Sequence, residues 1–128
     1  MTPHIGEFCR FTKMKKEAAL TDVIGSARKA AQEYHLVCVC KDARTVIADP
    51  SGLCRINTNG NSGMASAGTG DALFGIICGL LAQGLLPFEA ASFGVYLHGE
   101  AGDLAAAKCG EHGMLATDLI DSLREVLD

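Results

Sequence analysis

The feature that most constrains this chain is its longest apolar run, Ala72–Ala82, which contains two glycines and is bounded by Asp71 and Gln83. A membrane-spanning helix needs roughly 18 uninterrupted apolar residues, so this run is too short to cross a bilayer. It predicts instead a buried helix from Asp71 to Gln83, ended by Gly84 as a C-cap. Such a helix must be covered by other apolar elements of a folded protein.

Length and composition narrow the class of protein. The chain has 128 residues and a mass of 13.4 kDa, which suits one domain. A hydrophobic fraction of 48% excludes intrinsic disorder. The net charge is −4 and no Lys/Arg cluster occurs, so we expect neither a nucleic-acid nor a membrane partner. The segment Met1–Glu7 has no basic region followed by an apolar core, so it does not resemble a signal peptide.

The cysteines indicate a reducing compartment. None forms a C-x-x-C pair, and two of them replace Val or Ile in a strand-like run. Small secreted disulfide scaffolds do not also carry long apolar elements. We therefore expect reduced, buried thiols in a cytoplasmic protein, at Cys9, Cys38, Cys40, Cys54, Cys78 and Cys109.

The N-terminal half predicts one helix and three strands. We expect the first dozen residues to be irregular, because Pro3 and Gly6 interrupt them. Apolar residues recur at helical spacing from Glu17 to Tyr34. The run Leu36–Cys40 is typical of a strand covered on both faces. Two further strands, 45–48 and 53–57, flank the turn sequence 49–52 and predict a hairpin.

The C-terminal half predicts helices only. Pro87 is suited to the first position of a helix that continues to about Lys108. Gly110 and Gly113 mark a break, and a last amphipathic helix follows over 119–127. The order of elements is typical of an α/β protein. Three strands make a small sheet for so many helices, which suggests part of a larger unit.

The segment Gly68-Thr69-Gly70 leads directly into the apolar helix. Unpaired N–H groups of a first helical turn and the helix dipole both favour an anion there. Asp71 adds a carboxylate, which can accept a proton from a hydroxyl that attacks a phosphoryl group. The alternative is a plain capped helix with an acidic first turn. The density of Gly and Asn upstream, over 59–63, favours the anion site.

Three stretches resemble the ADP/ATP-dependent NAD(P)H-hydrate dehydratases of the ribokinase-like superfamily. The stretches Thr2–Arg10, Asn57–Asp71 and Gly94–Asp103 match the patterns T-P-H-x-G-E, G-N-x-G-M-A-x-x-G-[TS]-G-D and G-V-Y-L-H-G-x-A-G-D in the family's order. The resemblance implies the C-terminal half of a three-layer α/β/α ribokinase-like domain. It also implies repair of hydrated NADH and NADPH: ADP or ATP, with Mg²⁺, phosphorylates the ring hydroxyl, and phosphate then leaves.

The resemblance further implies roles for individual residues. His4 corresponds to a residue that contacts the hydrated dinucleotide, and Asp71 to the catalytic carboxylate at the substrate hydroxyl. Five residues correspond to the stretch that holds the AMP part of the nucleotide: Lys41, Asp42, Ala43, Arg44 and Thr45. Gly70 corresponds to the anion-hole glycine that touches the nucleotide. Together with the helix start described above, this places the phosphates at Gly68, Thr69 and Gly70. No metal-ligating side chain is implied.

Three further residues in these motifs have simpler interpretations. Glu7 is most simply a solvated carboxylate or a helix cap. His98 lies between Leu97 and Gly99 in a helical stretch and is best interpreted as a packed or capping histidine. Asp103 is interpreted as a partner of an N–H group or a lysine.

Two departures from the family bear on function. The family has glycine where this chain has Asp42, and a carboxylate about 5 Å from a phosphate would cost about 3 kcal/mol before screening, at an effective dielectric of about 20. The family domain is also roughly twice as long as this chain. We therefore expect either a homo-oligomer or a partner chain that supplies the other half-domain.

Two other functions remain open at this point. A small-molecule kinase of the same superfamily, acting on a vitamin-precursor alcohol, would use the same anion site and Asp71. A non-catalytic nucleotide-binding or interaction module is favoured by Asp42 and by the missing half. The first and third motifs favour the dehydratase over the kinase.

Overall fold

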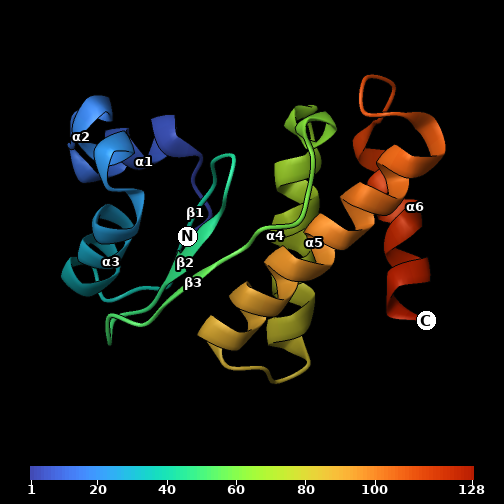
Figure 1. Ribbon diagram of the computed structural model, residues 1–128. Coiled ribbons are helices and arrows are strands. Elements are labelled where there is room, and N and C mark those ends of the chain that lie inside the picture. The colour runs from blue at the N-terminus through green and yellow to red at the C-terminus, as the bar shows by residue number, and fades with distance from the viewer. The chain divides into compact units, whose positions relative to one another are not determined.

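The computed structural model describes residues 1–128 (Figure 1). Its contacts divide the chain into two compact units, Met1–Thr58 and Asn59–Asp128. None of the helices combines the length and apolarity that crossing a bilayer requires.

The first unit places helices on a small antiparallel sheet. Strand β2 lies between β1 and β3, and the register sets Ala48 opposite both Cys38 and Cys54. Helix α3 packs on β1 and β2. The predicted hairpin is confirmed, with the Gly52 N–H donating to the Asp49 carbonyl at 3.0 Å in its turn. The elements are α1 (Ile5–Thr12), α2 (Lys16–Thr21), α3 (Val23–Glu33), β1 (Cys38–Cys40), β2 (Val46–Ala48) and β3 (Cys54–Ile56).

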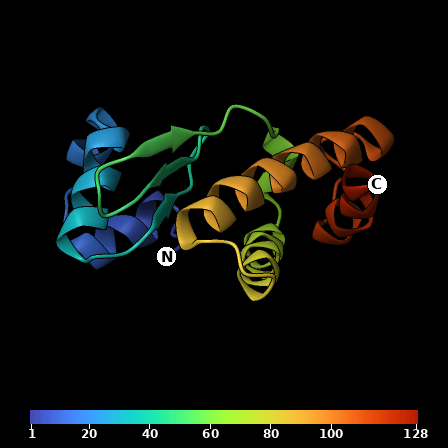
Figure 2. The same ribbon diagram turned by 90° about the horizontal axis from the view of Figure 1, so that it is seen from below.

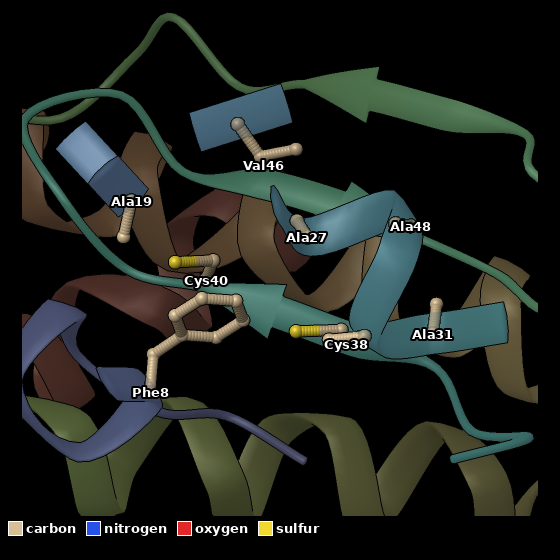
Figure 3. Packing of buried hydrophobic residues seen from close by; sticks show 9 residues of the cluster. Phe8, Ala19, Ala27, Ala31, Cys38, Cys40, Val46 and Ala48 are labelled. Atoms are coloured by element: carbon tan, nitrogen blue, oxygen red, sulfur yellow. The ribbon is translucent and has the colours of Figure 1, made fainter. Parts of the chain in front are cut away.

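Small side chains and one phenyl ring form the core of this unit (Figure 3). Phe8 of α1 points toward Cys38 and Cys40 of β1. Alanines of α2 and α3, with Val46 and Ala48 of β2, complete the cluster. Burial raises the pKa of the Cys38 thiol to about 12 and that of Cys40 to about 11. Both thiols therefore stay un-ionised and pack as small apolar groups, as the strand-like sequence predicted. The prediction of a buried thiol is wrong for Cys78 and Cys109, which are exposed because they lie outside the apolar cores.

An extended N-terminal segment lies alongside β1. The Val39 N–H donates to the Met1 carbonyl and the Lys41 N–H to the Pro3 carbonyl, each at 2.8 Å. The bridge between His4 and Lys41 is parallel. Residues 1–4 and β1 therefore run in the same direction and end side by side.

The prediction that the first dozen residues are irregular is wrong, because α1 occupies Ile5–Thr12. The His4 Nδ1 accepts hydrogen bonds from the N–H groups of Gly6 at 3.0 Å and Glu7 at 3.3 Å. The Glu7 carboxylate in turn accepts from the His4 N–H at 2.9 Å. These contacts form a capping box that starts the helix. Histidine is not among the usual N-cap residues, so the sequence pattern did not reveal it.

The single helix predicted over 17–34 is also wrong, since it is divided at Asp22. The backbone at Asp22 is not helical, with φ −144° and ψ 81°, and its carboxylate accepts the Gly25 N–H at 2.8 Å. Asp22 therefore ends α2 and caps α3. The strands are each shorter than predicted, although β1 and β2 are buried along their whole length as expected.

The second unit is helical and is organised around its longest helix. Figure 2 shows α5 with α4 and α6 packed against it. The predicted apolar helix is confirmed, but it begins at Thr69 because Gly68 adopts a left-handed conformation that turns the chain into it. Gly84, with φ +95°, follows its C-cap, and Pro87 starts the next helix as predicted. The elements are the 3₁₀ helix η1 (Ser62–Ala65), α4 (Thr69–Ala82), α5 (Pro87–Cys109) and α6 (Ala116–Leu127).

Candidate active site

The start of α4 is held in a fixed turn. Gly68 has φ +91°, which glycine adopts without strain. Thr69 is buried, and its hydroxyl lies 2.6 Å from the Met64 carbonyl and 2.8 Å from the Ser66 carbonyl. The hydroxyl therefore ties the first residue of the helix back to the preceding loop.

This turn presents backbone donors and a carboxylate at one helix end. The N–H groups of Gly70 and Asp71 lie in the first turn, where the helix itself supplies no acceptor. The helix dipole adds positive potential at the same end. The Asp71 side chain is exposed there. The arrangement is suited to binding an anion beside a carboxylate that can accept a proton.

Asn59 anchors the beginning of the preceding loop to α5. Its Nδ2 donates to the Tyr96 carbonyl at 3.1 Å and to the Glu100 carboxylate at 2.8 Å. A Cβ placed on Gly99 would lie 1.8 Å from the Asn59 Oδ1. Glycine at position 99 is therefore what allows the asparagine side chain to lie on the helix.

Asp103 anchors the next two residues. Its Oδ2 accepts the Gly60 N–H and its Oδ1 accepts the Asn61 Nδ2, each at 2.9 Å. The Asn61 Oδ1 in turn accepts the Gly63 N–H at 3.0 Å. Asp103 is thus an N–H partner, as predicted.

Sequence reasoning did not assign a role to Asn59 or Asn61. Their partners Tyr96, Glu100 and Asp103 recur at i, i+4 and i+7 on α5, which places them on one face of that helix. The carboxylates of Glu100 and Asp103, spaced i, i+3 on a helix, together with an Asn-Gly-Asn loop, are the signal that could have found these contacts.

His98 is a packed histidine, as predicted. It is 9% exposed, and its Nε2 lies 2.8 Å from the Thr69 carbonyl oxygen. The same helix that anchors the loop at Asn59 and Asp103 thus also contacts the first residue of α4.

In the first unit, His4 and Lys41 are brought together. They form the parallel bridge between the N-terminal segment and β1, so both lie where these two parallel segments end. Ligands of α/β proteins bind at the carboxyl ends of parallel strands. The His4 Nδ1 is occupied by the cap of α1, whereas its Nε2 lies 3.5 Å from the Glu7 Oε1. Both side chains are about half exposed, at 54% and 51%.

The segment Lys41–Thr45 forms the loop between β1 and β2. Lys41 and Thr45 at its two ends are half-buried, and the three residues between them are exposed. The Thr45 carbonyl accepts the Asn57 N–H at 2.9 Å, which fixes the end of the loop to the chain that follows β3. The Asp42 side chain is among the exposed ones.

The predicted site residues thus fall into two groups. His4 and Lys41–Thr45 belong to the first unit, and Gly68–Asp71 belong to the second. Glu7 is part of the capping box of α1, so its interpretation as a helix cap is confirmed.

Solved structures of similar proteins define the fold class. A ribokinase-like superfamily protein from Enterococcus faecalis superimposes with a TM-score of 0.84 at 34% identity, over 98% of this chain and 42% of that one. An ADP/ATP-dependent NAD(P)H-hydrate dehydratase from Bacillus subtilis, co-crystallised with ATP/Mg²⁺, gives a TM-score of 0.93 at 38% identity, over 98% and 46%. The chain therefore has part of the architecture of a ribokinase-like α/β protein.

Sequence comparison identifies the family. Residues 1–125 match the family model of the NAD(P)H-hydrate dehydratases. The chain is 50% identical over 127 residues to the bifunctional NAD(P)H-hydrate repair enzyme Nnr of Moorella thermoacetica, covering 99% of this chain and 24% of that enzyme. It is 38% identical over 126 residues to the ADP-dependent (S)-NAD(P)H-hydrate dehydratase of Bacillus subtilis, covering 98% and 46%. The chain belongs to the NAD(P)H-hydrate dehydratase family, and it spans less than half the length of these relatives.

Proposed function

We propose that this chain carries the phosphate-binding and catalytic part of a dehydratase that converts the hydrated forms of NADH and NADPH back to the intact cofactors. The proposed reaction uses ADP or ATP. The observation that carries the proposal is the start of α4, where a left-handed Gly68 precedes the first-turn donors and Asp71. Family membership supports the choice of substrate.

Each residue at the start of α4 has a distinct role in the proposal. The backbone of Gly68, Thr69 and Gly70 binds the nucleotide phosphates through N–H groups and the helix dipole. Asp71 accepts the proton of the substrate's ring hydroxyl, as a general base adjacent to a phosphoryl group does. The nucleotide supplies the phosphoryl group that turns this hydroxyl into a leaving group.

Residues of the first unit complete the assignment. We assign the AMP part of the nucleotide to Lys41–Thr45 and the hydrated dinucleotide to His4. The parallel ends at His4 and Lys41 support this, because such ends are where α/β proteins bind ligands. With Nδ1 accepting from the backbone, the neutral His4 ring carries its proton on Nε2 and offers a donor there.

The residues present fit a nucleotide accompanied by Mg²⁺. The start of α4 offers backbone donors for phosphate oxygens. Mg²⁺ usually keeps several water ligands and is bound in part through substrate phosphates. In the proposal, Mg²⁺ arrives with the nucleotide, and Asp71 acts as the base.

A cytoplasmic location is part of the same proposal. All six cysteines carry free thiols. Reducing compartments keep thiols in this state.

The substitution Asp71→Asn tests the proposed role of the carboxylate. It keeps the shape of the side chain and removes the base. In an intact protein that contains this segment and has dehydratase activity, turnover of hydrated NADH should therefore fall about 10²–10⁴-fold. ADP affinity should stay within about threefold, because the backbone donors are intact. Asp121→Asn, which removes an exposed carboxylate from α6, is the matched control and should leave turnover unchanged.

Two outcomes would contradict the proposal. Near-full turnover by Asp71→Asn would show that this carboxylate is not the base. Phosphorylation of a vitamin-precursor alcohol by the unmodified protein, without dehydration of the hydrate, would identify a kinase that uses the same site.

A further inference from the structure

We propose that His98 is a positioning residue of the anion site, acting through the peptide group that joins Thr69 to Gly70. The inference adds a residue to the proposed site. It rests on the proposed function because that function identifies the anion as a nucleotide phosphate. His98 is not placed against substrate or nucleotide. Its contact is with the backbone of the turn that presents the donors.

The contact is direct and shielded from water. The His98 Nε2 lies 2.8 Å from the Thr69 carbonyl oxygen, and the imidazole is 9% exposed. A carbonyl has no proton to give, so Nε2 must be the donor. The bond therefore requires that the His98 ring carry a proton on Nε2.

Planarity of the peptide bond transmits this contact to the anion site. The Thr69 carbonyl and the Gly70 N–H belong to one planar peptide group and point in opposite directions. Holding the carbonyl oxygen therefore fixes the direction of the Gly70 N–H. Donation to the carbonyl also polarises the peptide group, which strengthens the N–H as a donor.

Thr69 is held from its other side as well. Its hydroxyl lies within hydrogen-bond distance of the loop carbonyls of Met64 and Ser66 and shares its one proton between them, while its backbone carbonyl accepts from His98 on α5. The peptide group before Gly70 is thus fixed before any ligand arrives. Preorganised donors of this kind need no rearrangement when an anion binds.

Amide NMR spectra of the 128-residue chain test the proposal without any ligand. In His98→Leu, the amide resonances of Gly70 and Asp71 should shift and broaden. In His98→Gln, whose amide nitrogen can take the place of Nε2, they should return toward their original positions. Ala107→Gly weakens the same helix at an exposed position, so it is the matched control and should leave both resonances in place.

ADP binding gives a second measurement. His98→Leu should bind ADP about three- to tenfold more weakly, the size expected for one neutral hydrogen bond. His98→Gln should stay within about twofold of the original affinity. If the unmodified chain binds no ADP, the proposed nucleotide site has failed, whereas the amide resonances still decide the role of His98.

The unmodified chain also provides a test that is independent of folding by the variants. A long-range ¹H–¹⁵N spectrum of the His98 ring should show the proton on Nε2. A ring protonated only on Nδ1 would overturn the proposal, because Nε2 could not then donate to the carbonyl. Unchanged Gly70 and Asp71 resonances in His98→Leu would overturn it equally.

Discussion

At position 99 of α5 the second unit has room only for glycine, because the side chain of Asn59 lies against the helix there. A Cβ there would lie 1.8 Å from the Asn59 Oδ1 and 2.5 Å from its Cγ. Asn59 cannot simply swing away, since its Nδ2 is bonded to the Tyr96 carbonyl and to Glu100. By contrast, a Cβ on Gly79 of α4 would meet nothing within 4 Å.

These two glycines make a matched pair of substitutions. Gly99→Ala should lower the free energy of unfolding by about 1–3 kcal/mol, because it overfills a closed contact. Gly79→Ala should raise it by up to about 1 kcal/mol, because alanine favours the helix and meets no neighbour. Denaturant unfolding of both variants measures the difference.

A double variant identifies the cause of the loss. In an Asn59→Ala background, Gly99→Ala should cost less than it does alone, because the obstructing side chain has been removed. Equal costs in both backgrounds would mean that the clash with Asn59 is not what disfavours alanine at position 99.

The exposed position of Asp42 sets the size of its effect on the proposed nucleotide site. Solvent screens an exposed charge, so the repulsion from a phosphate should be far below the unscreened value. Asp42→Gly should tighten ADP binding by up to about fivefold, which corresponds to about 1 kcal/mol. Asp42→Asn separates the charge from the backbone and should recover most of this gain. Titration calorimetry measures both, and an unchanged affinity would mean that the carboxylate does not face the nucleotide.

At the scale of elements, the sequence predicted what depends on apolar pattern and on Gly or Pro. The hairpin, the apolar helix, the start of α5 at Pro87 and the last helix are all present. The sequence did not predict two local features. The histidine cap that starts α1 has no distinctive apolar pattern. The break at Asp22 lies inside a stretch whose apolar residues continue at helical spacing on both sides of it.

The same distinction holds for the candidate site. The turn before α4 could be predicted because a short glycine-rich segment and the following helix specify it locally. Its support by α5 could not, because the bonds from Asp103 to Gly60 and from His98 to Thr69 join residues distant in the sequence. Sequence pattern alone does not show which residues far apart along the chain will meet.

The capping box of α1 predicts a dependence on pH. The bond from the His4 N–H lowers the pKa of Glu7 below its usual value of 4.5, with smaller contributions from the nearby charges of His4, Lys41 and Arg10. A carboxylate with a depressed pKa stabilises the folded state above its unfolded pKa, and this contribution is lost as the pH falls through the folded pKa. The stabilising effect of Glu7 should therefore be complete near neutral pH and decline below about pH 4.5.

The substitution Glu7→Gln isolates this charge effect. Glutamine can still accept the His4 N–H, so the cap persists while its titration disappears. Thermal unfolding followed from about pH 7 to about pH 3 should show the variant less stable at neutral pH and equal to the original chain at the acid end. A constant difference over the whole range would show that the Glu7 charge is not responsible.

At the scale of the whole molecule, exposed apolar side chains on α4 predict association. Phe74 is 59% exposed and Leu81 is 41% exposed, and Cys78 between them is exposed as well. Their spacing of i, i+4 and i+7 places them on one face of the helix. Contiguous exposed apolar surface of this kind is uncommon on monomers. We therefore expect the isolated chain to self-associate.

Size-exclusion chromatography with light scattering tests this expectation. The measured mass should exceed 13.4 kDa and rise with concentration. Phe74→Lys, which replaces the most exposed large side chain of this apolar face by a charged one, should lower the measured mass. A monomer with a sharp, cooperative thermal transition would show instead that the 128 residues form a self-sufficient fold.

The attachment of the loop to α5 also bears on how sequences of this family can be recombined. The bonds from Asn59, Gly60 and Asn61 to α5 all lie within the second unit. A crossover before Asn59 would pass the loop and its helix from one parent as a block. A crossover between α4 and α5 would keep the bonds of Asp103, whose partners belong to the shared patterns, but could separate Asn59 from Glu100, which lie outside them. Shuffled libraries should accordingly retain fewer functional progeny with junctions at the second position than with junctions at the first.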